Sequence, residues 1–168
     1  MRNDKPAVAG GKPIREEPLR FGVPLIEQDE IDAVTQVLKS GWITTGPRTQ
    51  EFEERFRSYI GVRNAVALSS CTEGMELSLL ASGIGEGDEV ITTPFTFIAT
   101  SNAILFQRAK PVFADIEEET YNINPDDILE KITHRTKAIV CVHIFGHPFD
   151  VHAIMDICED HGLVLIED

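Results

Sequence analysis

The chain has 168 residues, of which 42% are hydrophobic and 26% are charged, and its formal net charge is −13. This length and composition are typical of a soluble globular protein with one sizeable core. The acidic balance excludes nucleic acid and anionic membrane as expected partners, because neutralising phosphates requires clustered Lys and Arg. Since no apolar run approaches the roughly 20 residues that cross a bilayer, we predict a cytoplasmic protein with no membrane segment.

Residues 1–20 contain three prolines, a Gly-Gly pair and five basic residues, without periodic apolar positions. This composition predicts a flexible leader before a folded region that spans residues 21–168. The three cysteines are Cys71, Cys141 and Cys158, and they have neither metal-ligand spacing nor the even count of a disulfide framework. We therefore predict reduced thiols and no metal site.

Two amphipathic helices are predicted in the first third of the chain. The first carries Ile31 and Leu38 on one face, and Gly41 stands where a helix would end. The second follows the turn at residues 44–47 and is closed by Gly61. Both apolar faces are expected to pack on another part of the protein.

After Gly61, short β-branched runs alternate with helical stretches. The strands are predicted at residues 65–68, 89–92, 111–114, 138–142 and 163–167, and the helices at about 72–82, at about 96–106, from 124 and from 150. This alternation predicts an α/β fold with a mainly parallel sheet and helices on both faces.

Ligands of such folds bind beyond the carboxyl ends of the strands, and residues 69–74 lead from the first predicted strand into a helix. The backbone N–H groups of Cys71, Thr72 and Glu73, with the Thr72 hydroxyl, would suit a phosphate at the helix N-terminus. Capping of the helix by Ser70 or Thr72 is the alternative, and the spacing does not distinguish the two. The glycine fingerprint of dinucleotide binding is absent here.

Three further strand ends carry candidate residues. Phe95 and Phe97 follow the second strand, where one ring would stack on a planar cofactor or both would pack in the core. His143 ends the fourth strand, as a pocket residue or as a histidine bonded to nearby backbone. Asp168 follows the last strand, where a carboxylate requires a positive partner such as a pyridinium nitrogen, unless it is simply an exposed acid.

Seven short motifs follow one another along the chain. They occupy residues 41–47, 70–73, 87–91, 95–100, 109–113, 136–139 and 164–168. In this order they resemble the DegT/StrS family of nucleotide-sugar aminotransferases, which depend on pyridoxal 5′-phosphate (PLP). The resemblance covers about residues 22–168. It implies the aspartate aminotransferase-like large domain of the fold-type I PLP enzymes, of which residues 21–168 would be the N-terminal part.

The resemblance also implies roles for the cofactor-binding residues. Cys71, Thr72 and Glu73 correspond to the start of the loop that binds the PLP phosphate. Phe97 corresponds to the aromatic residue that stacks on the pyridine ring, and Asp168 to the carboxylate that faces the pyridinium nitrogen.

Two further features concern substrate and catalysis. The turn formed by Thr44, Thr45 and Gly46 matches a segment near the active site of the family, and we assign it, together with His143, to substrate. In the family, the Schiff-base lysine follows the Glu-Asp pair that ends at Asp168. No lysine of this chain has that context, so we expect an N-terminal fragment that lacks the later strands and the C-terminal small domain and is inactive by itself.

For the whole enzyme, the resemblance implies transamination in amino-sugar biosynthesis. An amino acid, usually glutamate, would donate its amino group, and a keto group on a nucleotide-linked sugar would receive it in a homodimeric enzyme. Two alternatives stay open. One is a related sugar dehydratase, in which a histidine replaces the lysine, and the other is a non-catalytic binding or regulatory protein. The residue that decides between the two enzymes lies beyond Asp168.

Overall fold

The structure is a computed structural model that describes residues 5–20 and 22–168. The chain divides into two compact units, Met1–Ala65 and Val66–Asp168. Residues 1–4 of the predicted leader, and residue 21, where the predicted folded region begins, lie outside the described residues.

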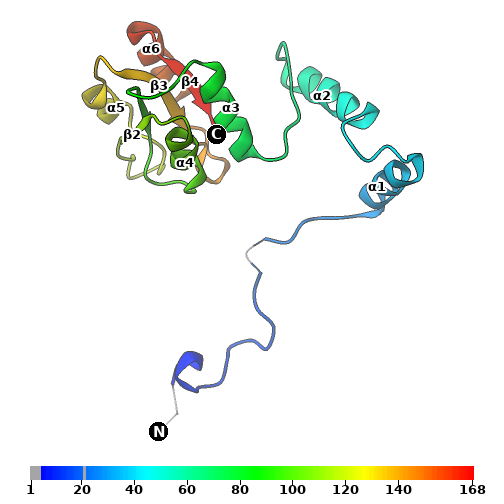
Figure 1. Cartoon of the computed structure of the whole chain (residues 1–168). Helices are drawn as coiled ribbons and strands as arrows, with labels where there is room; N and C mark the ends of the chain where they lie inside the picture. The colour runs from blue at the N-terminus through cyan, green and yellow to red at the C-terminus, as the bar shows by residue number, and fades with distance from the viewer. Residues whose placement is uncertain (1–4, 21) are drawn as a thin grey trace. The chain divides into compact units, whose positions relative to one another are not determined.

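The first unit contains a short 3₁₀ helix, η1 (Ala7–Ala9), and two α-helices, α1 (Gln28–Ser40) and α2 (Pro47–Ile60) (Figure 1). Both α-helices confirm the sequence prediction. Each one ends at a glycine with positive φ, 74° at Gly41 and 81° at Gly61. A residue with a Cβ rarely adopts this left-handed conformation, so the glycines set where the helices stop.

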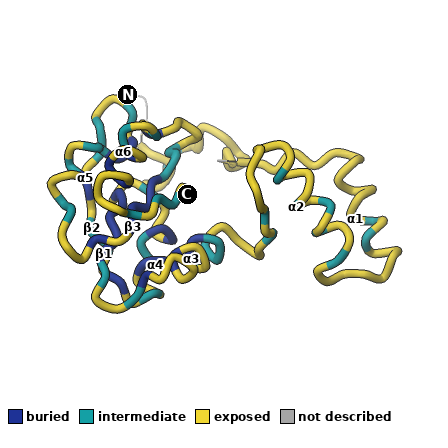
Figure 2. The backbone as a smooth tube through the Cα atoms, turned by 90° about the horizontal axis from the view of Figure 1, so that it is seen from above, coloured by how far each residue is buried: buried dark blue, intermediate teal, exposed yellow. Residues whose placement is uncertain are grey.

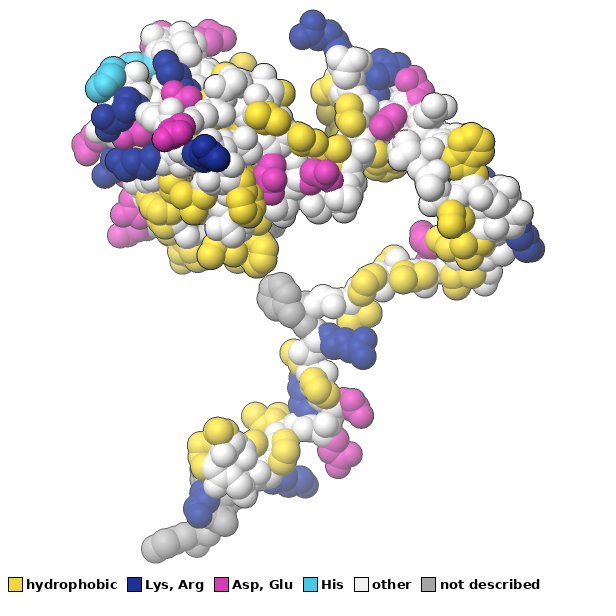
Figure 3. Space-filling view, viewed as in Figure 1, with side chains coloured by type: hydrophobic (Ala, Val, Ile, Leu, Met, Phe, Trp, Pro, Cys, Tyr) yellow, Lys and Arg dark blue, Asp and Glu magenta, His cyan; other side chains and the backbone are white. Residues whose placement is uncertain are grey.

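The apolar faces of α1 and α2 remain exposed, and neither helix contains a buried residue. Leu38 is 65% exposed, Phe52 57% and Tyr59 88%. Figure 3 shows such hydrophobic side chains on the surface of these helices. The amphipathic pattern predicts that these apolar faces pack against other protein surface. Within the described residues of the first unit, no such packing buries them.

The second unit is built on a four-stranded sheet. Its strands are β1 (Glu89–Thr92), β2 (Lys110–Phe113), β3 (Thr136–Cys141) and β4 (Val164–Glu167). Their order is β2-β1-β3-β4, and every neighbouring pair is parallel. The sheet confirms the predicted α/β class and four of the five predicted strands.

Helices cover both faces of this sheet, as predicted. They are α3 (Cys71–Ala81), α4 (Ala99–Phe106), α5 (Pro125–Lys131) and α6 (Val151–His161). Val90 packs in a buried cluster with residues of α3 and α4, whereas its neighbour Ile91 packs in a second cluster with residues of α5 and α6. Successive strand residues point to opposite faces, which makes β1 and β3 the buried centre of the unit (Figure 2).

The predicted start of α5 is confirmed in detail. The side chain of Asn124 accepts a hydrogen bond of 2.9 Å from the backbone N–H of Asp126, and Pro125 is the first helical residue. Among the described residues, no helix combines the length and apolar composition that are needed to cross a bilayer.

The predicted strand at residues 65–68 is wrong, because no strand forms there. Val66 and Leu68 are 72% and 43% exposed, while all four residues of β1 are buried. A buried parallel strand is stabilised by neighbours on its edges and by helices on its faces. The apolar composition of this run, in which Val66 is the single β-branched residue, does not supply those contacts.

The buried carboxylate of Glu89 ties together the amino ends of three strands. It is 1% exposed and accepts hydrogen bonds from Arg135 (2.7 Å), Lys110 (3.1 Å) and the Thr133 hydroxyl (2.6 Å). The bond from Thr133 is the largest cause of a lowered pKa, followed by the bond from Arg135. Against the opposing effect of burial, these contacts lower the pKa of Glu89 to about 2.

We predict that Glu89→Gln lowers the free energy of unfolding by about 2 kcal/mol at pH 7, since bonds to charged groups each contribute roughly 1.5–3 kcal/mol. The folded pKa lies below the ordinary value of 4.5, so the stabilisation is present above pH 4.5 and is lost as the pH falls towards 2. Urea unfolding should show that the difference in unfolding free energy between the native protein and Glu89→Gln becomes smaller from pH 7 to pH 2.5. Glu159→Gln, at an exposed position of α6, is the control. A difference that does not change with pH would contradict the assignment.

Candidate active site

The candidate site lies at the carboxyl edge of the sheet. Because all four strands are parallel, the residues that follow them emerge at the same edge. The backbone N–H of Asp168 donates to the Cys141 carbonyl (2.8 Å), and the backbone N–H of His143 donates to the Asp168 carbonyl (3.1 Å). The β3–β4 ladder therefore continues beyond the strand ends and sets His143 beside Asp168.

The side chain of Asp168 is half-buried and is held by two neutral donors. Its Oδ2 accepts a hydrogen bond of 2.8 Å from the Thr100 hydroxyl, and its Oδ1 accepts one of 3.3 Å from the Cys71 thiol. Figure 1 shows the C-terminus, which Asp168 forms, beside α3. The alternative of a freely exposed strand-end acid is therefore wrong. Since neither donor carries a charge, the negative charge of the ionised carboxylate is not neutralised by them.

The Asp168 carboxylate changes the pKa of the Cys71 thiol. The hydrogen bond to Asp168 is the main cause of a raised pKa at Cys71, and burial and the carboxylate charge add to it. The raised pKa keeps Cys71 a protonated donor. The other two cysteines, Cys141 and Cys158, are buried, and burial raises their pKa as well. Cys71 is thus the exposed thiol of the described chain.

The N-terminus of α3 is capped by Ser70, whose Oγ accepts a hydrogen bond of 3.2 Å from the backbone N–H of Glu73. The capping alternative is therefore confirmed for Ser70, and this N–H, which was predicted to bind a phosphate, donates to the cap in this structure. The Glu73 carboxylate turns back and accepts from the Ser69 hydroxyl (2.5 Å) and N–H (3.1 Å), which lowers its pKa. Helix geometry leaves the N–H groups of Cys71 and Thr72 without intrahelical acceptors.

Phe95 and Phe97 both lie outside the buried clusters, so core packing, the alternative for them, is wrong. Phe97 is 78% exposed and presents its ring just before α4. Phe95 instead contacts Tyr121, at 5.7 Å between ring centroids, and Phe145, at 6.2 Å. Of the two phenylalanines, Phe97 is the one whose ring face is available to a ligand.

His143 is fixed by side chains rather than by backbone, contrary to the alternative that the sequence left open. Its Nε2 lies 2.9 Å from Oε2 of Glu167, and its ring stacks on Phe149 with centroids 4.5 Å apart. The other ring nitrogen, Nδ1, is buried and has no hydrogen-bond partner among the described residues. A buried polar atom of this kind normally has a partner, which makes Nδ1 a candidate contact for a ligand.

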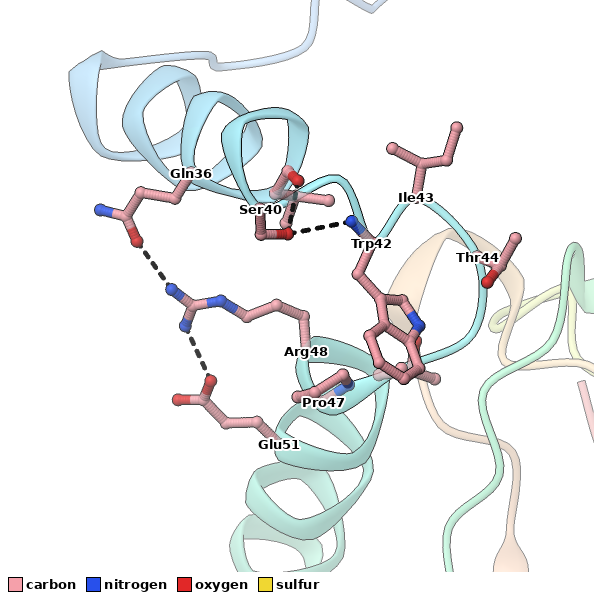
Figure 4. A pocket seen from close by; sticks show the side chains of 11 residues that line it. Gln36, Ser40, Trp42, Ile43, Thr44, Pro47, Arg48 and Glu51 are labelled. Carbon is pink, nitrogen blue, oxygen red and sulfur yellow. Dashed lines mark hydrogen bonds and ion pairs between the residues drawn. The ribbon is translucent and has the colours of Figure 1, made fainter.

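Thr44, Thr45 and Gly46 belong to the first unit. Thr44 and Gly46 line a hollow of about 490 Å³ between α1 and α2 (Figure 4). The indole N–H of Trp42 donates to the Thr45 carbonyl (3.0 Å). Arg48 crosses the same hollow, donating to Gln36 (2.7 Å) and Glu51 (2.8 Å). The turn is therefore shaped by the indole ring that covers it.

Gly46 lies directly beneath this ring, and a Cβ added there would overlap the indole of Trp42. We predict that Gly46→Ala displaces Trp42 and breaks its bond to Thr45, at a cost of about 1 kcal/mol. Fluorescence of the chain's single tryptophan reports the displacement as a shift in emission and in acrylamide quenching. Gly85→Ala, where a Cβ meets nothing within 4 Å, is the matched control. Equal spectra for both variants would contradict the packing.

Residues 24–168 match the DegT/DnrJ/EryC1/StrS aminotransferase family. The chain belongs to this family. Similar proteins include the uncharacterized protein MJ1066 of Methanocaldococcus jannaschii, 55% identical over 92% of this chain and 40% of that protein. The spore coat polysaccharide biosynthesis protein SpsC of Bacillus subtilis is 48% identical over 89% of this chain and 39% of its own length.

Solved structures show the same fold. An aminotransferase from Psychrobacter cryohalolentis superposes with a TM-score of 0.84 at 41% identity, over 86% of this chain and 37% of that one. NtdA of Bacillus subtilis, solved with its bound cofactor PMP (pyridoxamine 5′-phosphate), gives 0.81 at 36% identity, over 91% of this chain and 38% of that one. The chain thus spans about 40% of the length of these DegT relatives.

The structure also identifies residues that the sequence reasoning missed. Thr100 binds Asp168, and Glu167 binds His143, yet neither was predicted as a site residue. No local pattern in the sequence signals these contacts, because Thr96 precedes α4 and Thr100 lies 68 positions from Asp168.

Proposed function

We propose that this chain binds PLP and that the complete protein transfers an amino group from glutamate to a keto group on a nucleotide-linked sugar. The observation that carries the proposal is the Asp168 carboxylate, which neutral donors hold at the carboxyl end of a parallel strand. Membership of the aminotransferase family supports the reaction class. The relative SpsC, named for polysaccharide biosynthesis, supports a sugar product.

The residues at the sheet edge fit the chemical groups of PLP. Each carboxylate oxygen of Asp168 accepts one hydrogen bond here and has capacity for another, so a pyridinium N–H would find both charge and an acceptor. The free N–H groups of Cys71 and Thr72 suit an anionic phosphate at the start of α3. The exposed ring of Phe97 suits the face of a pyridine ring.

When bound, PLP supplies an electron sink, and the protein supplies binding, orientation and charge. Asp168 would hold a proton on the ring nitrogen. The N–H groups of Cys71 and Thr72 would bind the phosphate. The third predicted donor, the N–H of Glu73, donates to Ser70 instead. We assign the unpartnered Nδ1 of His143 to the bound sugar or amino acid.

The substrate assignment of the turn at Thr44, Thr45 and Gly46 remains part of the proposal. Threonine hydroxyls and the hollow that Thr44 and Gly46 line suit a polar ligand such as a sugar. We also place the Schiff-base lysine outside residues 1–168, and we propose that the chain alone is inactive. Lys110 binds Glu89 at the opposite edge of the sheet, and Lys131 lies 3.7 Å from Asp127, which supports this assignment.

The complete protein is further proposed to be a cytoplasmic homodimer. The unpaired thiols of the chain support a reducing compartment. The exposed apolar faces of α1 and α2 support burial against other protein surface. Light scattering of the purified protein would test the dimer, and a monomeric mass would contradict it.

Asp168→Asn tests the carboxylate in the complete protein. We predict that the variant still binds PLP, detected by visible absorbance after desalting, but transfers amino groups about 100-fold more slowly, which corresponds to ~2.7 kcal/mol in the barrier. The reason is that a neutral amide does not hold the ring nitrogen in its charged form. Asp156→Asn, at an exposed position of α6, is the matched control. Turnover of Asp168→Asn at the native rate would contradict the role.

The substrate class is tested by isotope transfer. We expect ¹⁵N from labelled glutamate to appear in the sugar when a nucleotide-linked keto sugar is supplied, with much less transfer to the same sugar without its nucleotide. Mass spectrometry of the product measures both. Loss of label from glutamate without its appearance in a sugar would contradict the proposed acceptor. Absence of PLP from the purified protein would contradict the proposal as a whole.

A further inference from the structure

Asp168 is held from two sides by different helices. The Cys71 thiol comes from the first residue of α3, and the Thr100 hydroxyl comes from the first turn of α4. Each donor takes a different oxygen of the carboxylate. Rotation of the carboxylate about its own bond would break both contacts, so the pair fixes its plane.

The number of protons on each of these side chains determines which group donates in each hydrogen bond. Thr100 Oγ1 lies 3.0 Å from Thr96 Oγ1 and 2.8 Å from Asp168 Oδ2. A hydroxyl has one proton, and an ionised carboxylate only accepts. Thr100 therefore donates to Asp168, and Thr96 must donate to Thr100. The result is a directed chain of hydrogen bonds, Thr96 to Thr100 to Asp168.

The helices that carry Cys71 and Thr100 are fixed by packing in the core. Thr100 is 1% exposed, and its neighbours Ala99 and Ala103 belong to the same buried cluster as Met75 and Leu79 of α3. The two helices that supply the donors therefore pack in one core. A buried, hydrogen-bonded hydroxyl on a packed helix has little freedom to follow a moving carboxylate, so it acts as a fixed point.

We propose that Thr100, oriented by Thr96, and Cys71 are positioning residues that fix the Asp168 carboxylate in the orientation that meets a cationic ring nitrogen. The inference rests on the proposed function for the identity of the cation, while the positioning itself concerns residues of this chain alone. Thr100 and Cys71 act through Asp168 and need no contact with the ring nitrogen.

The first test measures binding of the cofactor form that attaches without a covalent bond. The probes are pyridoxamine 5′-phosphate and its analogue in which a C–H replaces the ring nitrogen, and the complete protein is used. Thr100→Val, which keeps the shape but removes the hydroxyl, should raise the Kd for pyridoxamine 5′-phosphate about 10-fold. Its Kd for the analogue should change less than about twofold, because no ring N–H then needs Asp168.

Matched variants separate positioning from folding. Thr100→Ser keeps the donor and should leave both Kd values within about twofold of the native values. Thr96→Val leaves Thr100 in place and should give a smaller loss in the same direction. Equal losses for both probes in Thr100→Val would show a merely structural role and would overturn the inference.

The second test needs no cofactor. Alkylation of the exposed Cys71 thiol by iodoacetamide is followed by mass spectrometry of its peptide. Asp168→Asn should accelerate the reaction about threefold or more, because the charged acceptor that raises the thiol pKa is replaced by a neutral amide. If Thr100 holds the carboxylate against Cys71, Thr100→Val should shift the rate in the same direction, and Thr100→Ser should not.

An unchanged or slower alkylation rate in Thr100→Val would overturn the positioning role. A native protein that binds neither pyridoxamine probe would overturn the proposed function instead, and the alkylation rates would then decide the positioning role by themselves.

Discussion

The second unit depends on the parallel pairing of β1 with β3. Both strands are buried on both faces, because alternate residues enter two separate apolar clusters. Parallel pairing also forces every strand to end at the same edge of the sheet. The arrangement that stabilises the core is therefore the one that brings the ends of β3 and β4 together, so that His143 contacts Glu167 although the two lie 24 positions apart.

The two edges of this sheet carry carboxylates in contrasting environments. Glu89, at the amino edge, is buried and accepts from the cations of Lys110 and Arg135, so its charge is balanced within the chain. Asp168, at the carboxyl edge, accepts from a hydroxyl and a thiol, which orient it without neutralising it. A balanced carboxylate stabilises a fold, whereas an oriented but unbalanced one is suited to a cationic ligand.

The start of α3 shows how one short segment divides its hydrogen bonds between structure and ligand. Ser70 caps the helix through the N–H of Glu73, and the Glu73 carboxylate is directed back to Ser69. Two N–H groups, those of Cys71 and Thr72, remain at the helix end. Capping and anion binding are therefore compatible here, since they use different donors.

The sequence by itself determined the local features of this protein. Three local features act over a few residues, and their predictions are confirmed: the cap at Asn124, the glycine that ends α1, and the β-branched runs of β1 and β3. The position of Asp168 directly after a strand also follows from local pattern. The run at 65–68 is also apolar but forms no strand, because pairing depends on neighbours that composition does not specify.

Only the tertiary structure decided which groups meet. The Thr100–Asp168 bond joins residues 68 positions apart, and the Cys71–Asp168 bond joins residues 97 apart. The direction of the Thr96 hydroxyl and the occupied N–H of Glu73 likewise follow from three-dimensional contacts. Periodicity and capping rules describe neighbours along the chain, whereas the environment of a carboxylate is set by whichever helices pack beside it.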